Sequence, residues 1–208
     1  MASSSPPMVR DSSPPHGVRV STRRFEAAGA EDLGVCFAIE GAALDAGHSK
    51  LVGDATVLTT HARGRVADVL GDELTLDDAA GQTRVRFILP AGVSLAGLLD
   101  RFVSVEVTHR IRGNGATIID AAIRDSRGRL LLWAHDGALS TERSVHALQL
   151  RITHPPDGPP RLAIGAGKRA VTTVEAGSAG RVDGGDASYV ALVLRVGPGD
   201  ASYVLVRC

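Results

Sequence analysis

The hexapeptide Gly-Asp-Ala-Ser-Tyr-Val occurs at residues 185–190 of this chain and again at residues 199–204. Each copy continues into an apolar segment, and the turn-forming sequence Gly197-Pro198-Gly199-Asp200 lies between them. Glycine and proline supply the backbone angles of tight turns, and short apolar runs bounded by turns are typical of strands. The repeat therefore predicts one closing β-hairpin rather than two copies of a ligand site.

Alternation of apolar and polar residues extends upstream from this hairpin. One expected strand has apolar residues at the alternate positions Val85, Phe87 and Leu89, and another has them at Val103, Val105 and Val107. Further segments that we expect to be strands occupy residues 34–40, 55–60, 65–70, 73–77, 117–124, 129–135, 145–153, 161–164 and 170–174. A two-residue period with polar residues on one side is typical of antiparallel sheets with one buried face. We also expect residues 34–40 to pair with the C-terminal strand.

One segment has a helical period instead. Leu95, Leu98, Leu99 and Phe102 follow the spacing i, i+3, i+4 and i+7, with Ser94 as an N-cap. This spacing places the four apolar side chains on one stripe. It predicts a short helix over residues 94–102.

The order of these segments between residues 64 and 124 resembles the OB-fold, a small five-stranded β-barrel with a helix between its third and fourth strands. The residues that carry the resemblance are Gly64-Arg65-Val66, Glu73-Leu74-Thr75-Leu76, Val85-Arg86-Phe87, 95–102 and 103–107. They cover less than a third of the chain and match by element order, without a signature motif. The resemblance implies a small barrel that binds single strands or oligosaccharides by stacking on aromatic side chains. This segment departs from that pattern, because its aromatic residues are Phe87 and Phe102, and both occupy positions that we predict to be buried. Trp133 lies further along the chain.

The predicted fold class is thus all-β: an OB-like small barrel followed by a smaller antiparallel β-sheet lobe, in one globule or two. We expect a disordered leader over residues 1–32, which is rich in serine and proline. The barrel is expected over residues 45–138 and the C-terminal lobe over residues 143–208.

Composition limits the function classes. The chain has 208 residues with 23 basic and 23 acidic side chains, and only 3 % of its residues are aromatic. A balanced charge without long single-sign runs argues against nucleic-acid binding and against a polybasic membrane surface. No apolar run is long enough to cross a bilayer, and the written N-terminus has no secretory signal. The default compartment is the cytoplasm, or the cell envelope or exterior if the start codon is misassigned. Lys50 and Lys168 are the only lysines, which is typical of a GC-rich bacterial genome.

The cysteines leave two alternatives open. Cys36 and Cys208 are the only cysteines, and in a reducing compartment both would be unreactive thiols on strands. In an exported protein they would be the one pair able to form a disulfide, which would stabilise the fold by about 4–5 kcal/mol in the chain-entropy model.

Motifs for catalysis are incomplete. Gly165-Ala166-Gly167-Lys168-Arg169 lacks the first glycine of a phosphate loop and has arginine in place of its Ser or Thr. His109, Asp120 and His135 lie on strands that could be neighbours, so three ligands for a metal could meet there, although such residues more often face solvent. The sequence therefore identifies no catalytic, cofactor-binding or metal-binding residue, and we expect no cofactor.

The remaining candidates are aromatic. Tyr189 and Tyr203 lie one in each copy of the repeat and could pair across neighbouring strands, with hydroxyl groups toward a ligand, while Trp133 could cover a barrel end. The alternative for the tyrosines is half-buried packing with the hydroxyl at the rim.

Together these features favour a non-catalytic bacterial β-module that binds a ligand or protein or serves as a structural component. Two alternatives remain: a metal-dependent or other hydrolase using histidines such as His109 and His135, and an OB-type oligonucleotide binder.

Overall fold

The computed structural model describes residues 17–20, 36–41, 49–52, 55–71, 73–79, 81–112, 115–139, 143–145, 148–166, 171–184 and 187–208. Strands account for most of these residues, and within the described part of the chain the helical structure is one short 3-10 turn. The predicted all-β class is confirmed.

The strands are distributed along the whole chain. The first are β1 (Arg19–Val20), β2 (Cys36–Gly41), β3 (Ser49–Val52), β4 (Ala55–Leu70), β5 (Glu73–Asp78), β6 (Gly81–Ile88) and β7 (Val93–Ser94). The 3-10 turn η2 (Ala96–Leu98) is followed by β8 (Phe102–Arg112), β9 (Gly115–Asp125) and β10 (Leu130–Ala138). The last are β11 (Arg143–Val145), β12 (Leu148–Thr153), β13 (Arg161–Gly165), β14 (Thr172–Val174), β15 (Ser178–Asp183), β16 (Ser188–Val196) and β17 (Asp200–Arg207).

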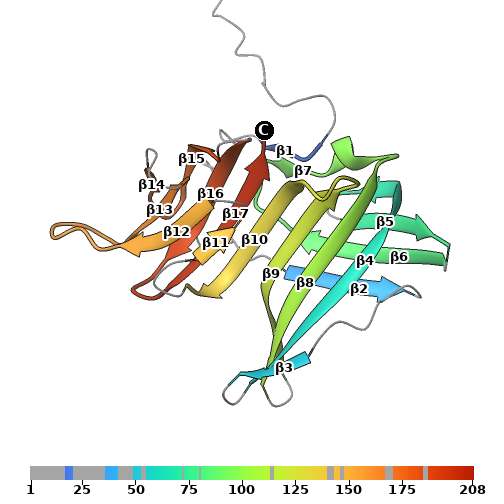
Figure 1. The fold of residues 1–208 in the computed structure, drawn as a ribbon, viewed down its shortest axis with the longest axis horizontal. Coiled ribbons are helices and arrows are strands. Elements are labelled where there is room, and N and C mark those ends of the chain that lie inside the picture. Colours follow the sequence, from blue (N-terminus) through green and yellow to red (C-terminus); the bar gives the residue numbers. More distant parts are fainter. Residues whose placement is uncertain are drawn as a thin grey trace, which may run out of the picture.

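Most strands belong to one large antiparallel sheet. Its order is β15-β16-β17-β10-β9-β8-β4-β5-β6-β2, and β3 pairs with β4 (Figure 1). The sheet bends after β4, so that β5, β6 and β2 run across the back of β4, β8 and β9, and β2 contacts β9. β11 to β14 form a separate four-stranded sheet, and β1 pairs with β7.

The long strand β4 connects the two parts of the bent sheet. It pairs with β8 from Thr56 to Arg65 and with β5 from Arg65 to Leu70. Gly64 lies at this change of partner, where an added Cβ would come within 2.6 Å of the carbonyl oxygen of Asp77. Only glycine lets the β5 backbone approach so closely.

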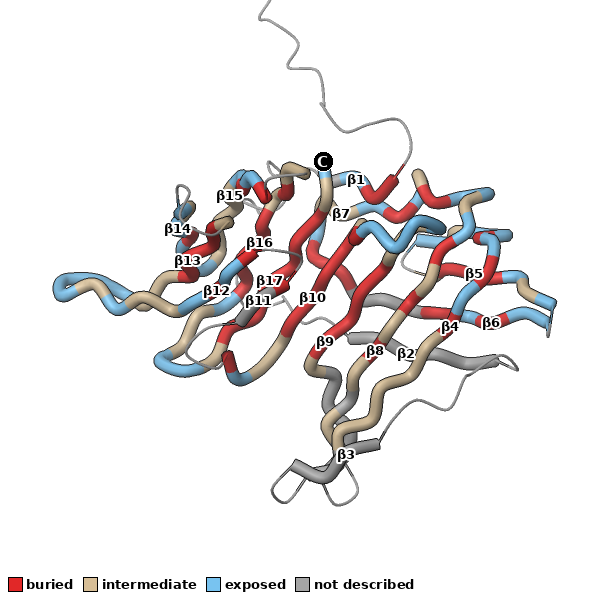
Figure 2. Tube along the Cα trace, viewed as in Figure 1, coloured by how far each residue is buried: buried red, intermediate tan, exposed pale blue. Residues whose placement is uncertain are grey.

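Two apolar cores lie on opposite faces of the large sheet. The inner core, enclosed by the bend, includes Val66, Leu74, Val85, Val105 and Val206. The outer core lies between β10, β17 and β16 and the small sheet, and its members include Leu130, Leu148, Leu162, Ile164 and Leu205. Figure 2 shows the consequence: β10, β16 and β17 are mostly buried, whereas β4 and β8 are partly exposed. Burial on both faces explains why β16 and β17 read as nearly continuous apolar runs.

The C-terminal repeat forms the predicted hairpin. β16 and β17 pair antiparallel, from Tyr189 opposite Arg207 to Val196 opposite Ala201. The prediction that residues 34–40 pair with the last strand is wrong, because β2 pairs with β6 while β17 lies between β16 and β10. Alternation shows which faces of β2 are apolar but carries no information on its partner.

The predicted barrel and helix differ from the structure. The smaller antiparallel sheet is present, but the large sheet does not close into a barrel, since β15 and β2 are its two ends in the described chain. Residues 94–102 form β7, the single turn η2 and the start of β8. Leu95 and Leu98 are buried as predicted, whereas Leu99 and Phe102 are each 49 % exposed. Ser94 lies near the turn, with its Oγ 3.4 Å from the backbone nitrogen of Ala96, but it is not the N-cap.

The domain boundaries stay a prediction. β11 to β14 lie in the segment predicted as a C-terminal lobe, whereas β15, β16 and β17 from the same segment extend the large sheet beside β10. The predicted disordered leader, residues 1–32, falls outside the described residues except for residues 17–20.

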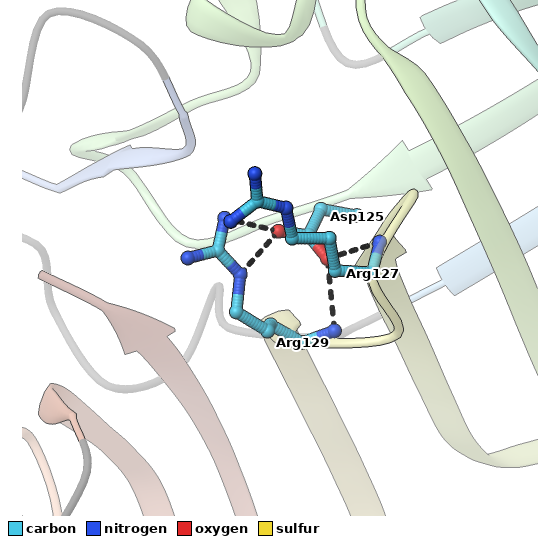
Figure 3. A network of polar contacts seen from close by, with 3 residues as sticks. All are labelled: Asp125, Arg127 and Arg129. Atoms are coloured by element: carbon cyan, nitrogen blue, oxygen red, sulfur yellow. Dashed lines mark hydrogen bonds and ion pairs between the residues drawn. The ribbon is translucent and has the colours of Figure 1, made fainter.

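The β9–β10 turn is held by one carboxylate. Asp125 accepts hydrogen bonds from the backbone N–H groups of Arg127 and Arg129, at 2.9 Å each, and pairs with the Arg129 guanidinium at 2.6 Å (Figure 3). Partial burial alone would raise the pKa of Asp125, but these hydrogen bonds and the Arg129 charge together bring the pKa below its ordinary value. The turn is therefore held by an ionised side chain.

Candidate functional site

A row of polar side chains crosses the outer face of the large sheet. We call it the polar row: Thr59, Thr108, Asp120, His135 and Tyr203, on β4, β8, β9, β10 and β17. Each member lies directly opposite the next on the neighbouring strand. Their immediate neighbours along the strands, including Val107, Ala121 and Val204, belong to the inner core. Alternation therefore places the polar row on the opposite, outer face.

His135 and Asp120 form the centre of the polar row. The Nδ1 of His135 lies 2.8 Å from Oδ1 of Asp120, and the two residues are only 2 % and 8 % exposed. A carboxylate accepts, so this bond puts the proton on Nδ1 of the imidazole. The Tyr203 ring lies on the other side, 5.2 Å from the His135 ring between centroids and tilted by 38°.

The polar row passes from the covered to the open part of the face. Tyr203 and His135 are buried, Tyr203 as a member of the outer core, whereas Thr108 and Thr59 are partly exposed and their hydroxyl oxygens lie 3.2 Å apart. An imidazole oriented by a carboxylate can act as a general base. The same pair can instead have a purely structural role, because a buried polar pair that is hydrogen-bonded helps to specify the register of the strands.

The sequence-predicted metal group is only partly assembled. Asp120 and His135 meet as described, but His109 lies opposite Leu58 and Ile118 in the backbone pairing, one position beyond the residue that faces Asp120. The His109 side chain lies outside the described residues. Among the residues that the structure describes, no group of three histidine, cysteine or acidic side chains is arranged to hold a metal ion.

The aromatic candidates are buried in the outer core. Trp133 lies opposite Ala122 and Leu205, one row from the His135–Asp120 pair. Tyr189 and Tyr203 are both buried, at 2 % and 0 % exposed, where half-burial was expected. They also lie opposite Arg207 and Val193 rather than opposite each other. Whether any of the three faces a ligand stays a prediction.

The two cysteines lie on strands far apart in the order of the large sheet. Cys36 begins β2, and its side chain lies outside the described residues. Cys208 follows β17 and is an exposed free thiol, whose pKa is raised by partial burial of the sulfur. The predicted disulfide is thus unconfirmed.

The part of the outer face next to the polar row carries charge and one exposed aromatic ring. We call it the open face: the outward residues His61, Arg63 and Arg65 of β4, Phe102, Ser104 and Glu106 of β8, and Arg124 of β9. In strand register they form three rows, and the middle row is Arg63, Ser104 and Arg124. Sequence analysis missed this group because Phe102 has the apolar spacing of a helix that does not form.

An ion pair and a histidine–carboxylate contact lie on the two sides of the open face. Arg65 donates to Asp100 at 2.5 Å, and His61 lies 3.5 Å from Glu106 between Nδ1 and Oε2. Arg63, between them, takes part in no ion pair among the described residues. It is exposed, so its guanidinium is available to a ligand.

Comparisons with known proteins add no assignment: no family model matches the chain, and neither the curated proteins nor the solved structures contain a match. In the described part of the chain, no helix has the length and hydrophobicity needed to span a bilayer.

Proposed function

We propose that this chain is a non-catalytic β-module that binds a partner on the open face. The observation that carries the proposal is the contrast between the two halves of one sheet face. The half formed by β10, β17 and β16 is covered by the small sheet, whereas the half formed by β4 and β8 keeps exposed charged and aromatic side chains.

The chemistry of the open face suits recognition better than stability. Ion pairs between exposed side chains add little to folding stability, typically about 0–1 kcal/mol. A half-exposed phenylalanine likewise leaves apolar surface in contact with water, and burying that surface against a partner would be favourable. Aromatic and arginine side chains are enriched at the centres of binding interfaces.

A ligand panel tests this proposal. We would titrate the chain with single-stranded oligonucleotides, acidic oligosaccharides, phosphopeptides and acidic proteins, and repeat each titration with Arg63→Glu. Arg151→Glu is the matched control, since Arg151 is also an exposed strand arginine but lies on β12 of the small sheet. Binding that is lost in Arg63→Glu and kept in Arg151→Glu supports the proposal. Binding that ignores Arg63, or no binding at all, overturns it.

A hydrolase is the second candidate function, and the His135–Asp120 hydrogen bond favours it. In this alternative Asp120 orients the imidazole and Nε2 of His135 takes the proton from a nucleophile. Turnover on a panel of ester, amide and phosphoester substrates, lost in both His135→Ala and Asp120→Asn, would support it. Metal analysis of the purified chain tests the metal-dependent form, which requires stoichiometric metal.

A further inference from the structure

We propose that an extended acidic segment of a partner protein binds this chain as an added strand, along the stretch of β4 from Thr59 to Arg63. This inference deepens the proposed function and rests on it, because His61 and Arg63 belong to the open face. Peptides are commonly recognised by addition to an exposed sheet edge. In that mode backbone hydrogen bonds supply affinity and alternate side chains supply specificity.

The pairing of β4 is interrupted on one of its two sides. On the first side β4 pairs with β8 without a break from Thr56 to Arg65. On the second side β3 pairs with β4 as far as Leu58, and β5 pairs with it from Arg65 onward (Figure 1). Between these two points no strand of the described chain pairs with the second side, and the β5 backbone lies close against Gly64. The open stretch is therefore residues 59–63, which is about the length of a typical strand.

The alternation of the backbone decides which residues direct hydrogen-bonding groups at this stretch. Val66 forms both of its backbone hydrogen bonds on the β8 side, at 2.8 and 2.9 Å. In an antiparallel ladder every second residue bonds to the same neighbouring strand, so the even-numbered residues of β4 before Val66 also bond to β8. Thr59, His61 and Arg63 therefore direct their N–H and C=O groups to the second side. Each of the three can donate one hydrogen bond to an added strand and accept one from it.

The burial of β4 agrees with an open edge. Thr59, Thr60 and His61 are partly exposed and Arg63 is exposed, although β4 lies well inside the order of the large sheet (Figure 2). Residues of β17, which is paired on both sides, are mostly buried. A row of unpaired backbone groups is a template for pairing with another chain. The open stretch is thus accessible to a partner strand.

The side chains along the stretch indicate the sequence of the partner strand. Residues of the added strand that lie opposite Thr59, His61 and Arg63 would face outward with them, and oppositely charged pairs in this arrangement are stabilising. A carboxylate therefore suits the position opposite Arg63. The imidazole of His61 already lies 3.5 Å from Glu106, so a neutral polar residue suits the position opposite His61. The alternate residues of the added strand would share the face of Ala62, which belongs to the inner core, so apolar residues suit them.

Other occupants fit the open stretch less well. A nucleic-acid strand carries a phosphate at every nucleotide, so Glu106 and Asp100, on the two sides of the open face, would repel it. A second copy of this chain, paired antiparallel about His61, would place Arg63 opposite Thr59 and leave no carboxylate opposite either arginine. An acidic peptide, in contrast, can carry its carboxylate at the one position where the arginine lies.

The test is amide hydrogen exchange of the full chain, measured by NMR with and without a peptide. The probe is the acetylated and amidated peptide Asp-Val-Thr-Val-Thr, whose aspartate lies opposite Arg63 when the peptide runs antiparallel to β4. In the free chain the amides of Thr59, His61 and Arg63 should exchange at least about tenfold faster than those of Thr60 and Ala62. The peptide should bind saturably, with a dissociation constant of about 1 mM or tighter, and should slow exchange at the first three amides.

Two control peptides and two variants separate strand pairing from charge. The peptide Asp-Val-Pro-Val-Thr lacks the N–H group that would donate to the His61 carbonyl, so it should bind at least about tenfold more weakly. The peptide Asn-Val-Thr-Val-Thr and the variant Arg63→Gln should each weaken binding about threefold, with little further loss when combined, because both remove the same exposed ion pair. Arg151→Gln should leave binding unchanged, and circular dichroism confirms that each variant is folded.

The other outcomes overturn the inference. Slow exchange at Thr59, His61 and Arg63 in the free chain shows that the edge is already paired, and protection that rises with protein concentration assigns the edge to a second copy. Equal binding of the threonine and proline peptides, or no binding at about 10 mM peptide, excludes an added strand. Strand pairing that ignores Arg63 overturns the acidic partner together with the proposed function. If another ligand of the panel binds in an Arg63-dependent manner while these three amides stay unprotected, the inference fails and the proposed function stands.

Discussion

A double-mutant cycle on Asp120 and His135 tests the most buried polar contact of the candidate site. The cycle compares Asp120→Ala, His135→Ala and the double variant with the unaltered chain. Each single variant leaves one buried polar partner without this hydrogen bond, whereas the double variant removes both. We therefore expect the double variant to be less destabilised than the sum of the two single variants.

The magnitude follows from the geometry. The bond is 2.8 Å long and joins residues that are 2 % and 8 % exposed. A hydrogen bond to a charged group in such a setting stabilises a fold by about 1.5–3 kcal/mol. The coupling energy should lie in that range. In a chain of this size each kcal/mol lowers the melting temperature by about 2–4 °C.

Urea denaturation followed by circular dichroism measures the free energy of unfolding of all four chains. The matched control is a cycle of Thr59→Val and Thr108→Val, which tests the neutral hydrogen bond at 3.2 Å in the same polar row. Its coupling should not exceed about 1 kcal/mol, because it is neutral and only partly buried. A coupling below about 0.5 kcal/mol for Asp120 and His135, the scatter seen for independent sites, would refute the reasoning.

Three further predictions concern the frame around the site. Because the pKa of Asp125 is lower in the folded chain, its stabilisation is complete above its ordinary pKa of about 4 and is lost as the pH falls through the folded value. Asp125→Asn should thus lower the free energy of unfolding at pH 6 by about 1–2 kcal/mol, and urea melts should show the gap to the unaltered chain narrowing toward pH 3. Gly64→Ala, whose Cβ would meet the Asp77 carbonyl, should cost about 1–3 kcal/mol in the same assay, whereas Gly199→Ala, with open space around it, should stay within about 0.5 kcal/mol. The raised pKa of Cys208 should make its alkylation by iodoacetamide at pH 8 slower than that of an unstructured cysteine peptide. Mass spectrometry of the reduced chain measures both rates, and equal rates would contradict this prediction.

Sequence patterns predicted the strands because strand formation is local. Alternation in Val103, Val105 and Val107 identified a strand with one buried face, and the repeated hexapeptide marked both strands of the closing hairpin. Turn chemistry and side-chain period depend on neighbours in the chain, so they can be read directly. The prediction of a short helix was wrong because the i, i+3, i+4 spacing of Leu95 to Phe102 also fits one 3-10 turn that leads into a strand.

The candidate site needed strand pairing, which is not local. Asp120 and His135 are 15 residues apart in the chain and become partners through the β9–β10 register. Arg63, Ser104 and Arg124 come together only because β4, β8 and β9 are adjacent. The sequence placed Asp120 and His135 on strands that could be neighbours, but no spacing fixes their register or signals the second group, since a strand can pair with any edge that matches its faces.

The sequence by itself determined the all-β class and the closing hairpin, because each depends on residue type and on period along a single strand. The tertiary structure decided that the large sheet bends instead of closing into a barrel, that His135 is buried against Asp120, and that Phe102 faces water beside Arg63. These outcomes depend on which strands lie next to each other and on where the small sheet covers the large one. The repeat illustrates the division: its residues specify a hairpin, but only its pairing with β10 brings Tyr203 beside His135.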